Sequence, residues 1–374
     1  MKKQKSLKVM TILGTRPEII RLSRVLPKMD MYFHHIMVYT RQSYDFELSD
    51  IFFRELELRK PDYLLDVKSD TLGGQIANII KQSESVLRKE LPDALLVLGD
   101  TNSCLSAIVA KRMHIPIFHM EAGNRSFDWD VPEEVNRRIV DHISDFNLCY
   151  TEHARRYLVA EGLHSKTVFV TGSPYAEILS YFGETIDANT IGSRLKLTPG
   201  KYFLVSTHRE ENVENAARLK EIVESLEHLA RMYKLPVVVS LHPRTKKKLS
   251  ALGKLHPLIQ FYKPFGFLEF AHLEKNARCV LSDSGTIQEE SAILGFPAVQ
   301  IRVSTERPEA FDAGSIIVVG FDRDAIADAV EMTLKERETG SGRIIPDDYK
   351  DMNVSEKVVK IIMGHAAIRK FHNR

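Results

Sequence analysis

Short apolar runs alternate with longer amphipathic stretches along almost the whole chain of 374 residues. β-Branched residues are frequent in the short runs, which predicts strands, and the apolar spacing of segments such as 73–91 predicts helices between them. Parallel strands need crossover connections, so this alternation predicts parallel sheets covered by helices. The expected strands are 8–13, 34–40, 94–99, 116–120, 146–151, 167–172, 202–207, 236–241, 258–262, 278–282, 297–301 and 315–320.

The strand series divides near Gly172 and Pro174, where we place a hinge. The length suits two domains. We expect an α/β fold with two Rossmann-like, doubly wound domains at 1–173 and 174–353, followed by a helical segment at 354–374. Ligands of open parallel sheets bind at the carboxyl ends of the strands, so two such domains predict a ligand cleft between them.

Composition excludes several classes of protein. The 52 Lys and Arg residues nearly balance 50 Asp and Glu residues, so the basic excess typical of a nucleic-acid-binding protein is missing. No apolar run approaches the roughly 18 residues that span a bilayer, so we expect no membrane partner. The sequence lacks CxxC, HExxH and GxGxxG, so we expect a cytoplasmic enzyme without a disulfide framework, metal or dinucleotide cofactor. Its three distant cysteines are Cys104, Cys149 and Cys279.

The segment SDSGTIQEE (282–290) follows an expected strand and opens a helix. Backbone N–H groups of Ser284, Gly285 and Thr286 at a helix N-terminus would form a phosphate site. One turn further, Glu289 or Glu290 could accept the two hydroxyls of a ribose. The alternative is an ordinary helix cap, with the acids favouring the helix dipole.

Arginines follow two other strands. Arg16 and Arg21 lie in GTRPEIIRLS (14–23), and Arg307 lies in STERPE (304–309). The planar guanidinium binds phosphate oxygens in pairs, which suits a diphosphate. An isolated arginine is more often a solvated surface residue, but phosphate donors at three separate strand ends favour a phosphate site.

Carboxylates mark the ends of the middle strands in the first half. Asp100 follows strand 94–99, Glu121 follows strand 116–120, and Glu133 and Glu134 lie in VPEEVNRR. An acid at the end of a buried strand is partly desolvated, which raises its pKa and suits it to proton transfer. As alternatives, Asp100 could cap a helix and Glu133 could simply occupy a first helical turn.

Two histidines, His208 and His242, follow adjacent expected strands in the second half, where each could meet a phosphate or a leaving group. A structural role is the alternative for both. Phe127 and Trp129, close to Glu121, could form an apolar wall for a sugar methyl group or could belong to the core.

The ordered motifs GTRPE, GDT, HMEAG, PEE-NR, THR-EN, SDSG-IQEE and TERPE resemble the non-hydrolysing UDP-N-acetylglucosamine 2-epimerase family over essentially the whole chain. The resemblance implies a fold like that of the GT-B glycosyltransferases, with two domains facing across a cleft. It also implies a last helix that crosses back to the first domain, and a homodimer. The variants LGDTNS and EAGNRSFD resemble the branch that converts UDP-N-acetyl-L-talosamine to UDP-N-acetyl-L-fucosamine in bacterial capsule or O-antigen biosynthesis.

The resemblance also implies roles for individual residues. The residues that match the catalytic positions of the family are Asp100, Glu121, Glu133 and His208. The residues that match its UDP contacts are Arg16, Arg21 (in place of Lys), His242, Phe270, Ser284, Gly285, Thr286 (in place of Gly), Glu290 and Arg307. One departure is Arg41, which replaces a glycine between Thr40 and Gln42 and would strain a turn that needs a positive φ.

The reaction that the resemblance implies needs no cofactor: UDP is eliminated to give a 2-acetamidoglycal and is then added back with inversion at C2. Four alternatives stay open. They are interconversion of UDP-N-acetylglucosamine and UDP-N-acetylmannosamine, a hydrolysing epimerase, a GT-B glycosyltransferase, and a catalytically inactive UDP-sugar sensor.

Overall fold

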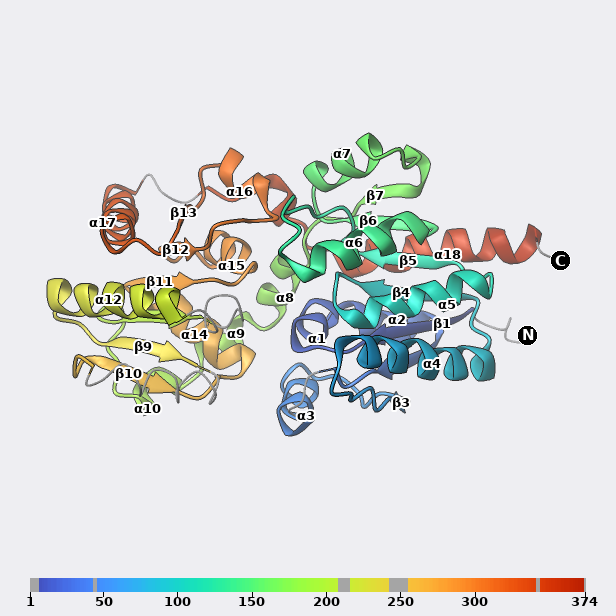
Figure 1. The fold of residues 1–374 in the computed structure, drawn as a ribbon, viewed down its shortest axis with the longest axis horizontal. Helices are drawn as coiled ribbons and strands as arrows, with labels where there is room; N and C mark the ends of the chain where they lie inside the picture. The colour runs from blue at the N-terminus through green and yellow to red at the C-terminus, as the bar shows by residue number, and fades with distance from the viewer. Residues whose placement is uncertain (1–6, 43–45, 208–215, 242–254, 341–343, 373–374) are drawn as a thin grey trace. The chain divides into compact units, whose positions relative to one another are not determined.

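The computed structural model describes residues 7–42, 46–207, 216–241, 255–340 and 344–372. The chain forms two compact units, which we treat separately. Unit 1 comprises Met1–Ile178 and Lys350–Arg374, and unit 2 comprises Leu179–Tyr349. Each unit consists of one sheet with helices on both faces (Figure 1).

Unit 1 contains a parallel sheet of seven strands in the order β3-β2-β1-β4-β5-β6-β7. Its strands are β1 (Lys8–Leu13), β2 (His34–Tyr39), β3 (Tyr63–Leu64), β4 (Ala94–Leu98), β5 (Ile117–Met120), β6 (Phe146–Cys149) and β7 (Val168–Val170). Its helices are α1 (Arg16–Leu22), α2 (Val25–Tyr32), α3 (Phe46–Glu55), α4 (Leu72–Glu90), α5 (Ala107–Arg112), α6 (Pro132–Ile143), α7 (Glu152–Ala160) and α18 (Val354–His372), with α8 (Tyr175–Tyr181) at the boundary and 3₁₀ turns η1 (Asn102–Ser106) and η2 (Ser165–Thr167).

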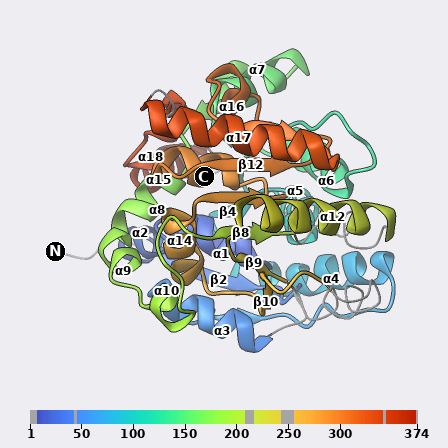
Figure 2. The same cartoon turned by 90° about the vertical axis from the view of Figure 1, so that its left-hand side faces the viewer.

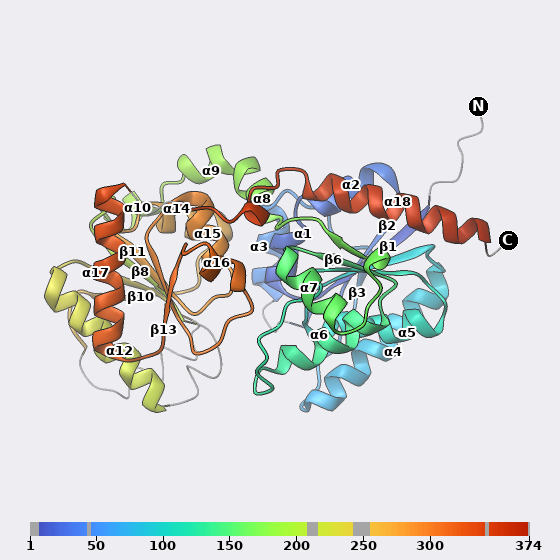
Figure 3. The ribbon, with the colours of Figure 1, turned by 90° about the horizontal axis from the view of Figure 1, so that it is seen from above.

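The unit 1 sheet lies between two helical layers (Figure 3). Helices α4, α5 and α6 cover one face, and α2 and α18 lie side by side on the other. The last helix, α18, is joined to this unit by His365, whose ring centroid lies 4.5 Å from that of Phe146 on β6. At its start, the Ser355 backbone N–H donates to Glu177 Oε2 at 2.8 Å. The final segment of the chain is therefore part of unit 1.

Unit 2 contains a parallel sheet of six strands in the order β10-β9-β8-β11-β12-β13. Its strands are β8 (Phe203–Ser206), β9 (Val237–Ser240), β10 (Ile259–Tyr262), β11 (Cys279–Ser282), β12 (Ala298–Ile301) and β13 (Ile317–Val319). Its helices are α9 (Gly183–Asp187), α10 (Ile191–Arg194), α12 (Ala216–Tyr233), α14 (Phe267–Asn276), α15 (Ile287–Leu294), α16 (Pro308–Asp312) and α17 (Arg323–Thr339), with a 3₁₀ turn η3 (Asp347–Tyr349).

The core of unit 2 has two layers because successive strand residues point to opposite faces. Phe203 and Val205 pack with α12 and α17, which lie side by side in Figure 2, whereas Leu204 packs towards α14 and α15. Both strand orders place the first strand of the unit beside the fourth, as in the Rossmann arrangement. The predicted fold class, two doubly wound parallel α/β domains, is confirmed.

The expected strands all occur, with ends that differ by two residues or fewer, and β3, which has two residues, is the one strand of the described segments that was not predicted. The helix predicted at 73–91 is α4, which ends where Leu91 adopts a left-handed conformation with φ 46°. Among the residues that the structure describes, no helix has both the length and the apolar character needed to cross a membrane.

Candidate active site

In unit 1, two of the predicted carboxylates, Asp100 and Glu121, lie at the carboxyl ends of neighbouring strands. β4 lies between β1 and β5 in the sheet, so the turns that follow these three strands are adjacent. Arg21 comes from the helix after β1, Asp100 follows β4, and Glu121 follows β5 directly. The fold thus brings together three of the residues that the sequence singles out.

Glu121 occupies a strained turn. Its φ is 61°, in the left-handed region that non-glycine residues rarely adopt, and its side chain is buried. The carboxylate forms an ion pair with Arg21 and accepts a hydrogen bond from Asn124 Nδ2 at 3.3 Å. A Cβ atom at Gly99 would lie 3.4 Å from Glu121 Oε2, so the turns that carry Asp100 and Glu121 touch at this point.

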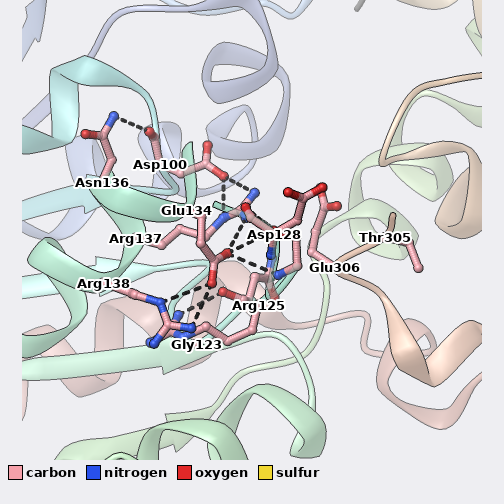
Figure 4. Close-up of polar contacts among 12 residues, drawn as sticks. Asp100, Gly123, Arg125, Asp128, Glu134, Asn136, Arg137, Arg138, Thr305 and Glu306 are labelled. Carbon is pink, nitrogen blue, oxygen red and sulfur yellow. Dashed lines mark hydrogen bonds and ion pairs between the residues drawn. The ribbon is translucent and has the colours of Figure 1, made fainter. Parts of the chain in front are cut away.

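Asp100 is held by helix α6 (Figure 4). Its Oδ2 accepts from Arg137 Nε at 2.8 Å and lies 2.7 Å from Arg137 Nη2, while Asn136 Nδ2 donates to the Asp100 carbonyl at 2.8 Å. The N-cap position of η1 is Thr101. The alternative in which Asp100 caps the next helix is therefore wrong, because its side chain faces Arg137.

The two glutamates of α6 differ in environment. Glu133 lies in the first turn and is exposed, whereas Glu134 is fully buried. Glu134 accepts from Arg137 at 3.1 Å, from Arg138 at 3.0 Å and from the backbone N–H of Ser126 at 3.1 Å, as Figure 4 shows in part. Glu134 thus fixes the loop after Glu121 to α6, a role that the sequence does not reveal.

The turn after β1 depends on a close approach at Gly14. A Cβ atom at Gly14 would collide with the hydroxyls of Thr40 and Ser103, which lie 2.8 Å apart. Pro17 lies in the first turn of α1, as expected. Glu18 Oε2 accepts from the backbone N–H groups of Gly14 at 3.0 Å and Thr15 at 2.8 Å.

Glu18 is an ionisable group that the sequence interpretation did not use. It is buried, and burial raises its pKa to about 7 against the opposing hydrogen bonds from Thr15, Gly14 and Thr101. The Thr101 hydroxyl donates to its Oε2 at 3.2 Å, so Glu18 connects the turn after β1 with the turn after β4.

Besides Arg21, the residues Arg16 and Arg41 lie near this end of the sheet. Arg16 is exposed, and its guanidinium lies 4.7 Å from the centre of the Phe52 ring. Arg41 has a φ of 55°, so this position adopts the left-handed conformation for which glycine is suited. The predicted strain at Arg41 therefore has a structural basis.

In unit 2, hydrogen bonds organise the turn between β11 and α15. The hydroxyls of Ser284 and Thr286 lie 2.8 Å apart, and Thr286 Oγ1 donates to Glu290 Oε2 at 3.0 Å. Thr286 occupies the N-cap position of α15 without a side-chain capping bond. The nearest atom to a Cβ at Gly285 would be Glu306 Oε1 at 3.0 Å. Ser284, Gly285, Thr286 and Glu290 thus form one cluster.

Arg307 lies beside the same helix. It is buried at the N-cap of α16, and its Nη2 lies 3.3 Å from Glu289 Oε2 on α15. Its backbone N–H donates to Thr305 Oγ1 at 3.3 Å, and Thr305 in turn accepts from Gln288 Nε2 at 3.1 Å. The segment TERPE and the turn at 284–286 are therefore linked within unit 2.

The remaining predicted residues are more scattered. Phe270 lies on α14, where it packs against one of the two core layers of unit 2. His208 and His242 lie outside the described residues. Phe127 and Trp129 are 62% and 65% exposed, so the interpretation of them as core residues is wrong. Their partners are Tyr157 and Arg138, respectively.

Comparison with known proteins decides the family. The family model described as UDP-N-acetylglucosamine 2-epimerase matches residues 28–363. The chain belongs to this 2-epimerase family.

Solved and curated relatives agree with this assignment. The UDP-N-acetylglucosamine 2-epimerase structure from Rickettsia bellii is 46% identical, with a TM-score of 0.90 over 97% of this chain and 98% of that chain. The UDP-GlcNAc 2-epimerase of Methanocaldococcus jannaschii, solved with UDP-GlcNAc and UDP, is 37% identical, with a TM-score of 0.88 over 95% and 99% of the two chains. A Pseudomonas aeruginosa relative named UDP-2,3-diacetamido-2,3-dideoxy-D-glucuronate 2-epimerase is 35% identical over 95% of this chain and all of its own length.

Sequence reasoning named Glu134 only as a candidate for proton transfer, and it missed other polar residues of this 2-epimerase that hold the carboxylates in place. Glu134, Arg137 and Asp141 are buried on one face of α6. Their spacing of three and four residues was the available signal, since it places three charged side chains on the same side of a helix. Glu18 and His119 lie within the motifs GTRPE and HMEAG, but only the fold shows what they contact.

Proposed function

We propose that this chain inverts C2 of a UDP-N-acetyl amino sugar by eliminating and re-adding UDP. The observation that carries the proposal is the arrangement of Asp100 and Glu121 on touching turns, each carboxylate paired with an arginine. Two carboxylates at neighbouring strand ends are suited to removing a proton and to supplying one.

The chemistry explains why a departing UDP is needed. C2–H of an N-acetyl sugar has no adjacent carbonyl, so it becomes acidic only as the C1–O bond breaks and positive charge develops at C1. The C1–O electron pair leaves with the β-phosphate oxygen of UDP, and a carboxylate takes the C2 proton, which leaves a C1=C2 double bond. In the return step UDP oxygen attacks C1, and C2 receives a proton on the opposite face.

We assign the proton transfers to Asp100 and Glu121, with Glu133 either holding the sugar or relaying a proton and His208 stabilising the departing diphosphate. Arg16 and Arg21 would stabilise the negative charge that develops on the departing UDP. These roles rest on the family resemblance and on the contacts of Asp100, Glu121 and Arg21 described above.

Unit 2 would bind the nucleotide. Arg307, His242 and the turn at Ser284, Gly285 and Thr286 would contact the diphosphate, because a helix N-terminus and a guanidinium both favour phosphate. Glu290 would accept from the ribose hydroxyls, and Phe270 would lie near the uracil. The hydrogen-bonded cluster of Ser284, Thr286 and Glu290 supports this assignment.

For the sugar, we propose the conversion of UDP-N-acetyl-L-talosamine to UDP-N-acetyl-L-fucosamine for capsule or O-antigen biosynthesis. The motif variants LGDTNS and EAGNRSFD support this branch. The exposed aromatic residues Phe127 and Trp129 offer an apolar surface that a 6-deoxy sugar methyl group could contact. Interconversion of UDP-N-acetylglucosamine and UDP-N-acetylmannosamine is the second candidate, favoured by the names of the relatives from R. bellii and M. jannaschii.

We also propose a cytoplasmic homodimer. The three cysteines are all free and buried, which fits a reducing compartment. The dimer rests on the family resemblance, and light scattering of the purified protein would test it.

The test of the reaction is proton NMR in D2O, with UDP-N-acetyl-L-fucosamine and UDP-N-acetylglucosamine supplied separately. Deuterium at C2 with appearance of the second epimer for the L-sugar alone would support the fucosamine branch. Exchange with UDP-N-acetylglucosamine would move the protein to the second candidate. Release of free sugar would indicate a hydrolysing epimerase, and UDP binding without exchange on either sugar would refute the proposal.

A further inference from the structure

A buried histidine–aspartate pair lies directly behind the turns that carry Asp100 and Glu121. His119 is on β5 and Asp141 is on α6, and both are fully buried. His119 Nδ1 lies 2.9 Å from Asp141 Oδ1, and His119 Nε2 lies 2.8 Å from the carbonyl oxygen of Gly99. The mechanism proposed above uses neither residue.

The partners of His119 determine its protonation. A carbonyl oxygen can only accept, so Nε2 must carry a proton. Asp141 accepts from Arg125 Nη1 at 2.7 Å and from the Gly123 backbone N–H at 3.2 Å, so it is an anion, and its negative charge 2.9 Å from Nδ1 favours a proton on that nitrogen as well. His119 is therefore an imidazolium.

The surrounding charges agree with this state. Burial lowers the pKa of His119, but the hydrogen bond and charge of Asp141, with smaller contributions from the Gly99 carbonyl and Asp100, raise it overall. Arg125 faces Asp141 from the loop after β5 and pairs with Glu161 at 2.6 Å. The charge of Asp141 also acts on two buried cysteines, Cys149 of β6 and Cys104 of η1; burial raises the pKa of both, so both stay thiols.

The pair contacts both turns at backbone groups next to the carboxylates. Gly99, with φ 65°, precedes Asp100, and its N–H donates to the Met120 carbonyl while its own carbonyl accepts from His119. Gly123, with φ 82°, follows Glu121 by two residues and donates to Asp141. Glu121 itself is left-handed, and strained residues of this kind persist only where surrounding contacts hold them.

We propose that the His119 imidazolium and Asp141 are positioning residues that hold the turns of Asp100 and Glu121 in the geometry required for proton transfer at C2. This inference rests on the proposed function of those two carboxylates. His119 reaches the turn after β4, Asp141 reaches the turn after β5, and the ion pair between them fixes one turn relative to the other.

The first test observes the protonation directly. In protein labelled with ¹⁵N-histidine, at about pH 7.5, one histidine should show both ring nitrogens protonated, although free histidine is mostly neutral there. That signal should disappear in His119→Asn or, if this variant does not fold, change in Asp141→Asn. A neutral His119 would overturn the proposal, and this measurement can be made on the wild type alone.

The second test separates positioning from stability. Asparagine at 119 keeps a polar amide beside Asp141 but is too short to reach Gly99. The matched control is His35→Asn, because His35 on β2 of the same sheet has Nδ1 2.7 Å from Asp30 Oδ1 and Nε2 2.9 Å from the Thr11 hydroxyl. His35 is the second residue of β2, so it lies at the opposite end of the sheet from the carboxylates.

Both substitutions should lower the Tm. We expect His119→Asn to lower kcat for C2 exchange about 10-fold or more with KM changed less than about threefold, since small misplacements of catalytic groups are costly. His35→Asn should keep kcat within about twofold of wild type. If the two variants retain equal kcat, the inference fails. If the wild type exchanges no UDP-sugar, the proposed function fails instead, while the ¹⁵N measurement still tests the imidazolium.

Discussion

Replacing Glu18 with glutamine should change how the stability of unit 1 depends on pH. Glu18 is 1% exposed, and its Oε1 has no hydrogen-bond partner among the described residues. Burial raises its pKa from 4.5 to about 7. Folded protein therefore holds this proton to higher pH than unfolded protein does, and the contribution of Glu18 to stability falls as pH rises through this range.

The size of the effect follows from the two pKa values. At about 1.36 kcal/mol for each pKa unit, full ionisation of Glu18 costs about 3 kcal/mol of folding free energy. Only part of this change falls between pH 5 and pH 8. Between pH 5 and pH 8, we expect the free energy of unfolding of Glu18→Gln to rise by about 2.5 kcal/mol relative to that of the wild type, because glutamine is neutral at both pH values. Its amide oxygen can still accept from Gly14 and Thr15.

Urea unfolding at about pH 5 and pH 8 measures this difference. Trp129 is the only tryptophan and lies in unit 1, so its fluorescence reports on the unit that contains Glu18. The control is Glu84→Gln, the same change at a side chain of α4 that is 39% exposed. A free-energy difference between Glu18→Gln and wild type that stays the same at both pH values would refute the reasoning.

Three further predictions concern the proposed site. Asp100→Asn and Glu121→Gln should each lower the rate of C2 exchange by about 100-fold or more, while the Kd for UDP, measured by calorimetry, changes less than about threefold. Retained exchange in both variants would remove the two residues from the mechanism. Arg307→Lys keeps a charge beside Glu289 but loses the planar fork, so the Kd for UDP should rise about 10-fold, and an unchanged Kd would exclude Arg307 from the site. Arg41→Gly should remove the strain of the left-handed conformation and raise the free energy of unfolding by about 0.5–1 kcal/mol, measured by thermal unfolding. A lower Tm would show that the arginine side chain stabilises the fold by more than the strain destabilises it.

Most of the fold could be predicted because the strands of a doubly wound sheet are buried on both faces. Segments such as 94–99 and 236–241 are continuous apolar runs flanked by polar loops, which is the pattern of parallel strands. β3 was missed because it has only two residues and one of them, Leu64, is 49% exposed at the sheet edge. A strand that short carries no periodicity.

The candidate site could be predicted only in part. Ser284, Thr286 and Glu290 are close in sequence, so local spacing already places them on one turn and one helix. Residues that stabilise the site from other elements could not be found in this way. Arg137 is 37 residues from Asp100, which it holds, and nothing in the local sequence of either residue indicates that contact.

Local periodicity and motif order are therefore enough to predict the α/β class, the positions of most strands and the set of polar residues at strand ends. Which of those residues meet, and in what state, depends on contacts between distant segments. Glu18 has a raised pKa, His119 is an imidazolium and Glu121 is held in a left-handed conformation because distant segments bury and contact them. Burial and charge pairing are properties of the folded chain, and local sequence does not encode them.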